Sequence, residues 1–228
     1  MGSRVLAIIP AYNEEECIVD TVSELRATVP DVDFLVVNDG SSDATADLCR
    51  QHGYPLLDLP INGGLAVGFQ AGMKYANRAG YDYAIQFDAD GQHEPVYIPS
   101  LVDRAIQSSA DIVIASRFLS EPKGTSARML GSRVITAIIE LTTGKRINDP
   151  TSGMRLFNRA MIHRFAVDDR ANPEPETLAL LIHEGKRVEE VQVTMRERQG
   201  GESYLTLSRS MSYMLRACFS ILFVRWFR

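Results

Sequence analysis

Short apolar runs alternate with amphipathic stretches through the first half of the chain. Residues 5–9 (Val-Leu-Ala-Ile-Ile) form a continuous apolar run, which is typical of a strand buried on both faces. The next apolar side chains recur at the spacing of one helix face: Ile18, Val22, Leu25 and Val29. Asn13, with Glu16 three residues later, resembles a capping box at the start of that helix.

The same alternation continues as far as residue 115. It predicts strands at 34–37, 56–59, 81–87 and 112–115, and helices at 44–52, 64–79 and 98–108. Strands separated by helices favour a mostly parallel, Rossmann-like α/β sheet with helices on both faces. Ligands of such sheets bind beyond the carboxyl ends of the strands, so the polar residues at those ends matter most.

The second half of the chain is less regular. It predicts helices at 127–143 and 177–183, strands at 154–157 and 188–195, and a hinge-like loop with glycines at 200 and 201. Repeats, low-complexity segments and linker-like composition are missing, so we expect one domain over residues 1–205. An amphipathic helix over residues 206–228 is expected to follow it.

Composition narrows the class of protein. A length of 228 residues suits one domain, and 45% hydrophobic with 23% charged residues is ordinary for a globular protein. A formal net charge of −5 argues against a nucleic-acid partner. The 3 cysteines are far apart, which fits a reducing, cytoplasmic setting. No run reaches the ~20 apolar residues that span a bilayer.

Several common site motifs are missing from the sequence. The turn after the first strand contains no glycine, unlike the G-x-G-x-x-G turn of dinucleotide-binding dehydrogenases. Neither a P-loop nor a G-x-S-x-G nucleophile elbow occurs. The 4 histidines show no metal-ligand spacing. These absences exclude the commonest nucleotide-binding and hydrolase signatures.

Three polar clusters follow predicted strands: residues 10–14 (Pro-Ala-Tyr-Asn-Glu), 38–43 (Asn-Asp-Gly-Ser-Ser-Asp) and 88–93 (Asp-Ala-Asp-Gly-Gln-His). Such residues can simply cap helices, since Asn, Asp and Ser are common at helix starts. Three clusters at strand ends of one sheet nevertheless favour convergence on a single crevice.

Asp88 and Asp90 are the most informative pair. In an extended stretch, residues i and i+2 point to the same side, so both carboxylates can approach one cation. Oxygen ligands together with diphosphate oxygens suit Mg²⁺ or Mn²⁺, and Gln92 and His93 follow within reach of the same ion. We therefore expect a divalent metal at Asp88 and Asp90.

The order of these clusters resembles the family-two glycosyltransferases of the GT-A fold. Further strings resemble the polyprenyl-phosphate sugar transferases of the dolichyl-phosphate mannose synthase group: 62–64 (Asn-Gly-Gly), 115–117 (Ala-Ser-Arg), Arg128 with Ser132, and 149–155 (Asp-Pro-Thr-Ser-Gly-Met-Arg). The resemblance covers residues 4–205.

The resemblance implies a role for each matching residue. The nucleotide-sugar would contact Pro10, Tyr12, Glu14, Asp39, Gly64, Asp88 and Ala89, with Asp39 on the base. The metal on the diphosphate would be held by Asp88, Asp90 and Gln92. The acceptor phosphate would contact Arg117, Arg128 and Ser132, although these arginines can equally form surface salt bridges. The implied reaction is the inverting transfer of one sugar to a polyprenyl phosphate, for cell-envelope glycan or glycoconjugate synthesis.

The acceptor decides whether the reaction needs a base. A lipid phosphate is mostly ionised at pH 7, since its second pKa is about 6, and it requires positioning by cations instead. A sugar or protein hydroxyl requires a carboxylate, for which Glu174, Glu176 and Asp149 are candidates. Transfer to a hydroxyl with Glu176 as base is therefore the main alternative. A non-catalytic nucleotide-sugar binding protein is a second alternative, which the intact Asp88 and Asp90 disfavour.

The last residues are basic, aromatic and apolar. Four arginines and no acidic residue follow Glu202, and such a helix can lie at a membrane surface. It can equally pack on the sheet or on a sister subunit. Leu222 stands where processive synthases of the family carry Gln in Q-x-x-R-W, which favours a single transfer. We expect a cytoplasmic protein, peripheral on the inner face of the membrane. A homo-oligomer, a small membrane-protein partner, the sugar and the choice of UDP or GDP stay open.

Overall fold

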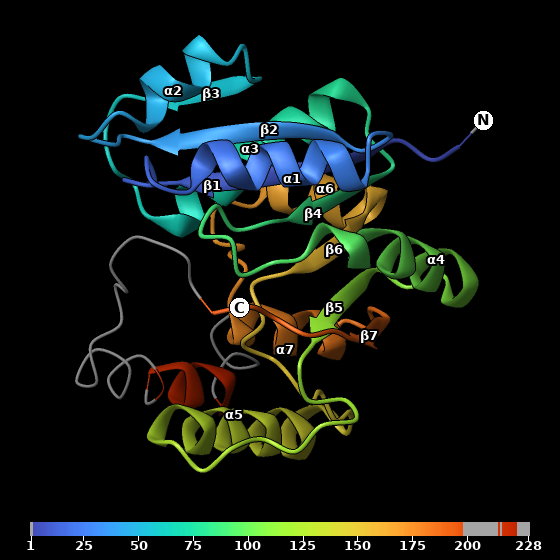
Figure 1. The fold of residues 1–228 in the computed structure, drawn as a ribbon. Helices are drawn as coiled ribbons and strands as arrows, with labels where there is room; N and C mark the ends of the chain where they lie inside the picture. The colour runs from blue at the N-terminus through green and yellow to red at the C-terminus, as the bar shows by residue number, and fades with distance from the viewer. Residues whose placement is uncertain (1, 198–213, 215, 223–228) are drawn as a thin grey trace.

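The computed structural model describes residues 2–197, 214 and 216–222, and its fold is one sheet with helices on both faces (Figure 1). The elements in chain order are β1 (Val5–Ala11), α1 (Ile18–Thr28), β2 (Asp33–Asp39), α2 (Thr45–Gln51), β3 (Leu56–Leu59), α3 (Leu65–Ala79), β4 (Tyr83–Gln86), the 3₁₀ turn η1 (Pro95–Tyr97), α4 (Ile98–Ser108), β5 (Ile112–Ser116), α5 (Ala127–Thr143), β6 (Arg155–Asn158), α6 (Arg159–Val167), α7 (Pro175–His183) and β7 (Val188–Gln192).

The sheet has seven strands in the order β3-β2-β1-β4-β6-β5-β7. All neighbouring pairs are parallel except those of β6, which runs antiparallel to both β4 and β5. The predicted mostly parallel α/β sheet is confirmed. Because β2, β1 and β4 are adjacent, the three polar clusters that follow them start at the same edge of the sheet.

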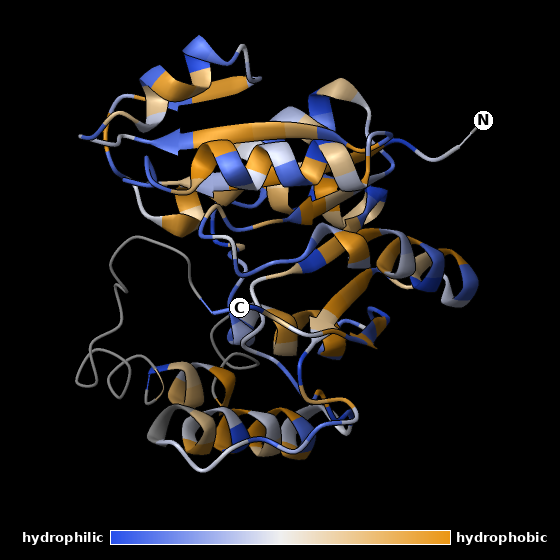
Figure 2. Ribbon diagram, viewed as in Figure 1, coloured by the Kyte–Doolittle hydropathy of each residue, from blue (hydrophilic) through white to orange (hydrophobic). Residues whose placement is uncertain are grey.

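The central strand β1 is buried on both faces, as its apolar run predicts. Leu6 and Ile8 face a core shared with α3 and α6, while Ala7 and Ile9 face a second core shared with α1 and α4. The colouring of Figure 2 shows apolar strands in the middle of the molecule and polar surfaces on the outward sides of the helices. Burial of this strand anchors the loops at its carboxyl end.

Helix α3 lies unusually close to β1. A Cβ on Gly72 would be 2.3 Å from Cγ2 of Ile8, so only glycine permits this approach. On the same side, Phe69, Phe157 and Phe165 form a cluster with ring centroids 5.1–5.4 Å apart. The tight packing fixes the start of α3, which borders the predicted nucleotide pocket.

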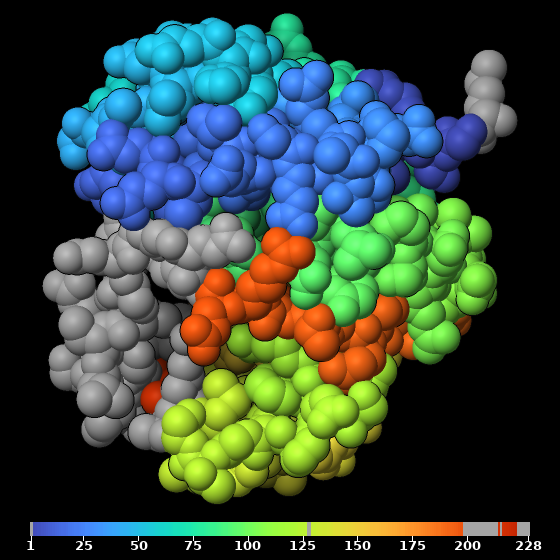
Figure 3. All heavy atoms as spheres, viewed as in Figure 1, coloured from blue at the N-terminus to red at the C-terminus, as the bar shows by residue number. Residues whose placement is uncertain are grey.

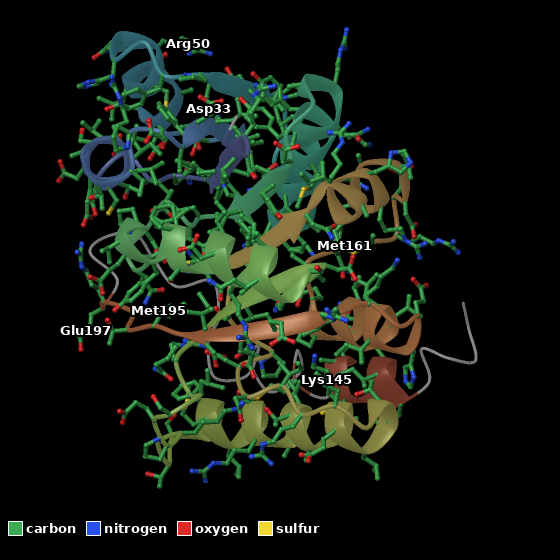
Figure 4. The ribbon with its side chains drawn as sticks, turned by 90° about the vertical axis from the view of Figure 1, so that its right-hand side faces the viewer. Asp33, Arg50, Lys145, Met161, Met195 and Glu197 are labelled. Atoms are coloured by element: carbon green, nitrogen blue, oxygen red, sulfur yellow. The ribbon has the colours of Figure 1, made fainter. Side chains whose placement is uncertain are left out.

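Helix α5 lies beyond the β5–β7 end of the sheet, with α7 packed against it (Figure 1). Lys145, just after α5, reaches back to β7, where its ammonium donates to the carbonyl of Val188 (Figure 4). Residues 216–222 are helical and lie along α5, with Ala217 and Ile221 buried. Residues 216–222 therefore pack on the protein, which was one of the two expectations for the C-terminal helix. Residues 198–213 and 223–228, which include the two loop glycines, lie outside the described residues.

Two local predictions need correction, and one helix was missed. The first strand extends through Pro10 to Ala11 because both residues pair with β2. The proposed capping box is wrong, since α1 follows Cys17 without a side-chain cap and Asn13 bonds elsewhere. Helix α6 (Arg159–Val167) was not predicted at all.

Among the described residues, every helix is too short or too polar to cross a bilayer.

Candidate active site

The loops after β1 and β2 are joined by hydrogen bonds. The backbone N–H of Asn13 donates to Oγ of Ser41 at 2.9 Å, and Oδ1 of Asn13 accepts from the N–H of Ser42 at 2.8 Å. The N–H of Glu14 donates to Oγ1 of Thr45 at 2.9 Å. Asn13 has a φ of 55°, which turns the loop toward β2. The polar clusters that follow β1 and β2 are thus joined to each other, as two of the three that were predicted to converge.

Asp39, at the end of β2, is almost completely buried and holds the turn before α3. Its carboxylate oxygens accept from the N–H of Gly63 at 2.8 Å and from that of Gly64 at 2.7 Å. Gly40 next to it has a φ of 65°, and a Cβ there would be 2.5 Å from the backbone of Ile61. The end of β2 and the start of α3 therefore form one rigid wall.

Asp88 and Asp90 follow β4 and occupy different environments. The side chain of Asp88 is 33% exposed, and its Oδ1 accepts from Nε2 of Gln86 at 3.2 Å. Asp90 is buried, and its Oδ1 accepts from the N–H of Gln92 at 3.0 Å. Asp88 is thus the more accessible of the two carboxylates.

The buried imidazole of His93 lies against Asp88. Its Nδ1 accepts from the backbone N–H of Asp88 at 2.9 Å, so the proton of the neutral ring is on Nε2. That Nε2 lies 3.6 Å from Oδ2 of Asp88. His93 therefore supports the main chain and the carboxylate of Asp88 together.

Gly153 bounds the same carboxylate and lies next to His93, since a Cβ at this position would also be 3.5 Å from Cε1 of the imidazole. A Cβ at this position would be 2.7 Å from Oδ2 and 3.5 Å from Cγ of Asp88. The glycine precedes β6, which lies next to β4 in the sheet. Its lack of a side chain leaves the space that the carboxylate occupies.

The donor chemistry around Asp88 suits a hard divalent cation. No group of three His, Cys, Asp or Glu side chains forms a complete metal cage in the described part of the chain. Two carboxylates and the amide of Gln92 fit an ion that takes its remaining ligands from diphosphate oxygens and water. The residue types present are therefore compatible with a divalent cation such as Mg²⁺ or Mn²⁺.

Residues 193–197 run along the rim of this region. The N–H of Arg196 donates to the carbonyl of Gln92 at 3.1 Å, and its guanidinium binds both carboxylate oxygens of Glu24 at 2.8 Å. In Figure 3 this orange strip lies against the segment that follows β4, and Figure 4 shows Met195 and Glu197 at its end. Gln92 is thus held from the side of β7.

A second polar region, built around Arg117, follows β5. The guanidinium of Arg117 donates to both oxygens of Asp149, from Nε at 2.7 Å and from Nη2 at 2.9 Å. Asp149 is completely buried, and its N–H donates to Glu190 of β7 at 2.9 Å. The carboxylate of Asp149 is thus committed to orienting Arg117, which competes with its predicted use as a proton acceptor.

Lys123 and Thr136 complete this region, and neither of them was predicted from the sequence. Nζ of Lys123 donates to Oγ of Ser132 at 2.8 Å and to Oγ1 of Thr136 at 3.0 Å. Ser132 and Thr136 are four residues apart on α5, a spacing that could have indicated a shared hydroxyl face. Burial lowers the pKa of the Lys123 ammonium, an effect opposed by Asp149 and reinforced by the positive charge of Arg117.

The loop over residues 149–153 connects the two regions. It contacts Arg117 at one end through Asp149 and Asp88 at the other end through Gly153. Buried Arg155 donates to the carbonyls of Pro150 at 2.7 Å and Pro173 at 3.0 Å. This ties the loop to the turn before α7, whose first turn carries Glu176.

The other predicted residues lie as follows. Three of them line the carboxyl end of β1 and are partly buried: Pro10, Tyr12 and Glu14. Gly64 caps α3, and buried Ala89 accepts a hydrogen bond from Oγ1 of Thr21 at 2.9 Å. Arg128 belongs to the first turn of α5, but its side chain lies outside the described residues. Glu174 immediately precedes α7.

The sheet order and this arrangement define the fold class as GT-A. The solved structure of glucosyl-3-phosphoglycerate synthase from Mycobacterium tuberculosis, in complex with Mn²⁺, UDP-glucose and phosphoglyceric acid, superposes with a TM-score of 0.71 at 16% identity. The match covers 98% of this chain and 80% of that one.

The family is shown by sequence. The profile described as glycosyl transferase family 2 matches residues 6–165. Undecaprenyl-phosphate mannosyltransferase of Micrococcus luteus is 32% identical over 89% of this chain and 88% of its own. Polyprenol monophosphomannose synthase of Mycolicibacterium smegmatis is 32% identical over 93% of this chain and 85% of its own. The chain belongs to glycosyl transferase family 2 and is a glycosyltransferase.

Proposed function

We propose that this glycosyltransferase moves one sugar, with inversion, from a nucleotide-sugar to a polyprenyl phosphate. The observation that carries the proposal is the loop over 149–153, which contacts the carboxylate of Asp88 at one end and orients Arg117 at the other. A donor diphosphate and an acceptor phosphate would thereby lie on the two sides of one short segment. The names of the two relatives, an undecaprenyl-phosphate mannosyltransferase and a polyprenol monophosphomannose synthase, support this assignment.

The donor side would use the first three strand ends. Pro10, Tyr12 and Glu14 would line the nucleotide, with Gly64 and Ala89 as backbone contacts. Asp39 would shape the base pocket by holding Gly63 and Gly64, and each of its oxygens has a further lone pair for a base N–H. Asp39 would thus contact the base while its carboxylate keeps the observed hydrogen bonds to the N–H groups of Gly63 and Gly64.

Asp88, Asp90 and Gln92 would hold Mg²⁺ or Mn²⁺. The bound cation would neutralise the charge that develops on the diphosphate leaving group. Asp88 would present the more exposed carboxylate to the ion, and Asp90 would also fix the turn, since its Oδ1 accepts from the N–H of Gln92. His93 and Gly153 would keep Asp88 in place.

The acceptor side would be cationic. Arg117, Arg128 and Ser132 would receive the phosphate, and Asp149 would hold the fork of Arg117. A phosphate oxygen is already ionised, so the attack needs no proton acceptor. Glu176 and Glu174 would be needed as bases only for a hydroxyl acceptor.

The test is to incubate the protein with UDP- and GDP-sugars, Mn²⁺ and undecaprenyl phosphate. We expect a sugar–phosphate–lipid product by mass spectrometry, with inverted anomeric configuration by NMR. Undecaprenol without phosphate should give no product.

Asp88→Asn should lower the rate at least about 100-fold, and excess chelator should abolish it. Asp103→Asn, an exposed acid of α4, is the matched control and should behave like the wild type. Product formed only with a hydroxyl acceptor, and lost in Glu176→Gln, would support the alternative reaction. Full activity in chelator would contradict the metal assignment.

A polyprenyl phosphate is held in a membrane, and we propose that the protein acts at the inner surface of that membrane. Two helices next to the cationic region expose large apolar side chains: Leu130, Val134 and Leu141 on α5, and Phe219 and Leu222 on the C-terminal helix. We propose that these side chains contact lipid.

A further inference from the structure

Lys123 is held in a defined position by two hydroxyl groups. Its Nζ donates to Ser132 and Thr136 at 2.8 and 3.0 Å, and its main-chain carbonyl accepts from Nη2 of Arg133 at 2.6 Å. An ammonium group has three N–H donors. Within the described residues, the third N–H of Lys123 has no acceptor.

Among the described residues, no carboxylate forms an ion pair with Lys123. Arg117 nearby is paired with Asp149, whereas no carboxylate of the described residues lies within 4.0 Å of Nζ of Lys123. The side chain is half-buried, and its ammonium lies 5.5 Å from the ring of Phe118, on which the guanidinium of Arg117 also rests at 5.2 Å. Asp149 and Glu190 act on this half-buried cation only from beyond contact distance, so an incoming anion in direct contact would stabilise it.

We propose that Lys123 is a further phosphate-binding residue of the acceptor site, where its ammonium donates to the phosphate monoester while Ser132 and Thr136 hold it in place. This inference rests on the proposed function. Ser132 accepts from Lys123 and so keeps its own hydroxyl proton to donate to the same phosphate. Thr136 acts through Lys123 as a positioning residue.

The depressed pKa of Lys123 agrees with this role. Burial lowers the pKa most, and the phosphate dianion would supply the negative charge that favours the ammonium form. A lysine that merely tied its loop to α5 would affect folding and leave the acceptor KM unchanged. The two roles are therefore separable by kinetics.

The first experiment compares Lys123→Met with the wild type, using a short-chain prenyl phosphate as acceptor. Loss of a charged hydrogen bond made in both ground and transition states should raise the acceptor KM about 10- to 100-fold. The donor KM and kcat should change little, and Lys123→Arg should recover most of the loss. Lys74→Met, which removes an exposed lysine of α3 that pairs with Asp169, is the matched control and should change nothing.

An acceptor KM in Lys123→Met equal to that of the wild type would overturn the inference and leave the proposed function intact. Absence of lipid product with the wild type would overturn the proposed function, and the inference with it.

A second measurement uses the wild type and so does not depend on the folding of a variant. Acetylation of the Lys123 amine can be quantified by peptide mass spectrometry, and a phosphate bound to that amine should slow it. The prenyl phosphate should protect Lys123 several-fold and leave Lys74 unprotected, while the matching prenol should protect neither. If inorganic phosphate alone also protects Lys123 from acetylation, the residue recognises the phosphate headgroup rather than the prenyl chain. Equal labelling of Lys123 with and without prenyl phosphate would overturn the inference.

Discussion

Gly153 leaves room for the carboxylate of Asp88, and this makes it a sensitive position. In Gly153→Ala the new Cβ would lie 2.7 Å from Oδ2, so the carboxylate would have to rotate away. We expect kcat/KM to fall about 100-fold, because a displacement of about 1 Å at a reacting centre has that effect. The Mn²⁺ concentration for half-maximal activity should also rise.

Steady-state kinetics over a Mn²⁺ titration checks this prediction, with the melting temperature as the control for folding. A variant with the wild-type rate and metal requirement would show that Asp88 tolerates the displacement.

The sequence located the acidic residues of the candidate site but not all of their contacts. Asp88 and Asp39 could be identified because strand ends are local features of the chain. The pairing of Arg117 with Asp149 could not, since it joins residues 32 positions apart through the fold. Lys123 carries no local signal, because its importance depends on hydroxyls that another element provides.

At the scale of elements, the contact between α3 and β1 can be tested with a pair of glycines. In Gly72→Ala the added Cβ would meet Ile8 at 2.3 Å, whereas in Gly68→Ala its nearest neighbour would be Pro10 at 3.7 Å. Overpacking should destabilise Gly72→Ala by about 1–3 kcal/mol. Gly68→Ala should be neutral or more stable by up to about 1 kcal/mol, because alanine favours a helix.

Urea unfolding of both variants measures the difference in free energy of unfolding. Equal stabilities would show that β1 and α3 shift apart without cost.

The elements themselves were largely predictable, and the exceptions have physical causes. Strands and helices of the first half appeared as apolar periodicity, and α5 was predicted with its observed ends, Ala127–Thr143. Helix α6 was missed although Asn158 caps it, because it follows β6 without a connecting loop. The antiparallel direction of β6 could not be predicted, since strand pairing depends on distant residues.

On the scale of the whole molecule, the cationic region and the exposed apolar side chains share α5. Ser132 and Thr136 face Lys123, whereas Leu130, Val134 and Leu141 are 45–80% exposed and follow the spacing of a single helix face. A lipid acceptor has its phosphate at the membrane surface and its chain in the bilayer. One helix can therefore bind the phosphate and contact the lipid around it.

Replacing part of this apolar face with charge should weaken membrane binding. Leu130→Glu with Val134→Glu should lower the fraction that co-sediments with anionic vesicles about tenfold or more, because each buried side chain contributes about 1.5–3 kcal/mol. Ile106→Glu, on α4 and 53% exposed, is the matched control and should still bind. Turnover of a short, water-soluble prenyl phosphate should be unaffected in all variants, while that of undecaprenyl phosphate in vesicles should fall with binding. Vesicle binding that persists in the double variant, and is lost only when residues 206–228 are removed, would assign membrane contact to the C-terminal segment rather than to α5.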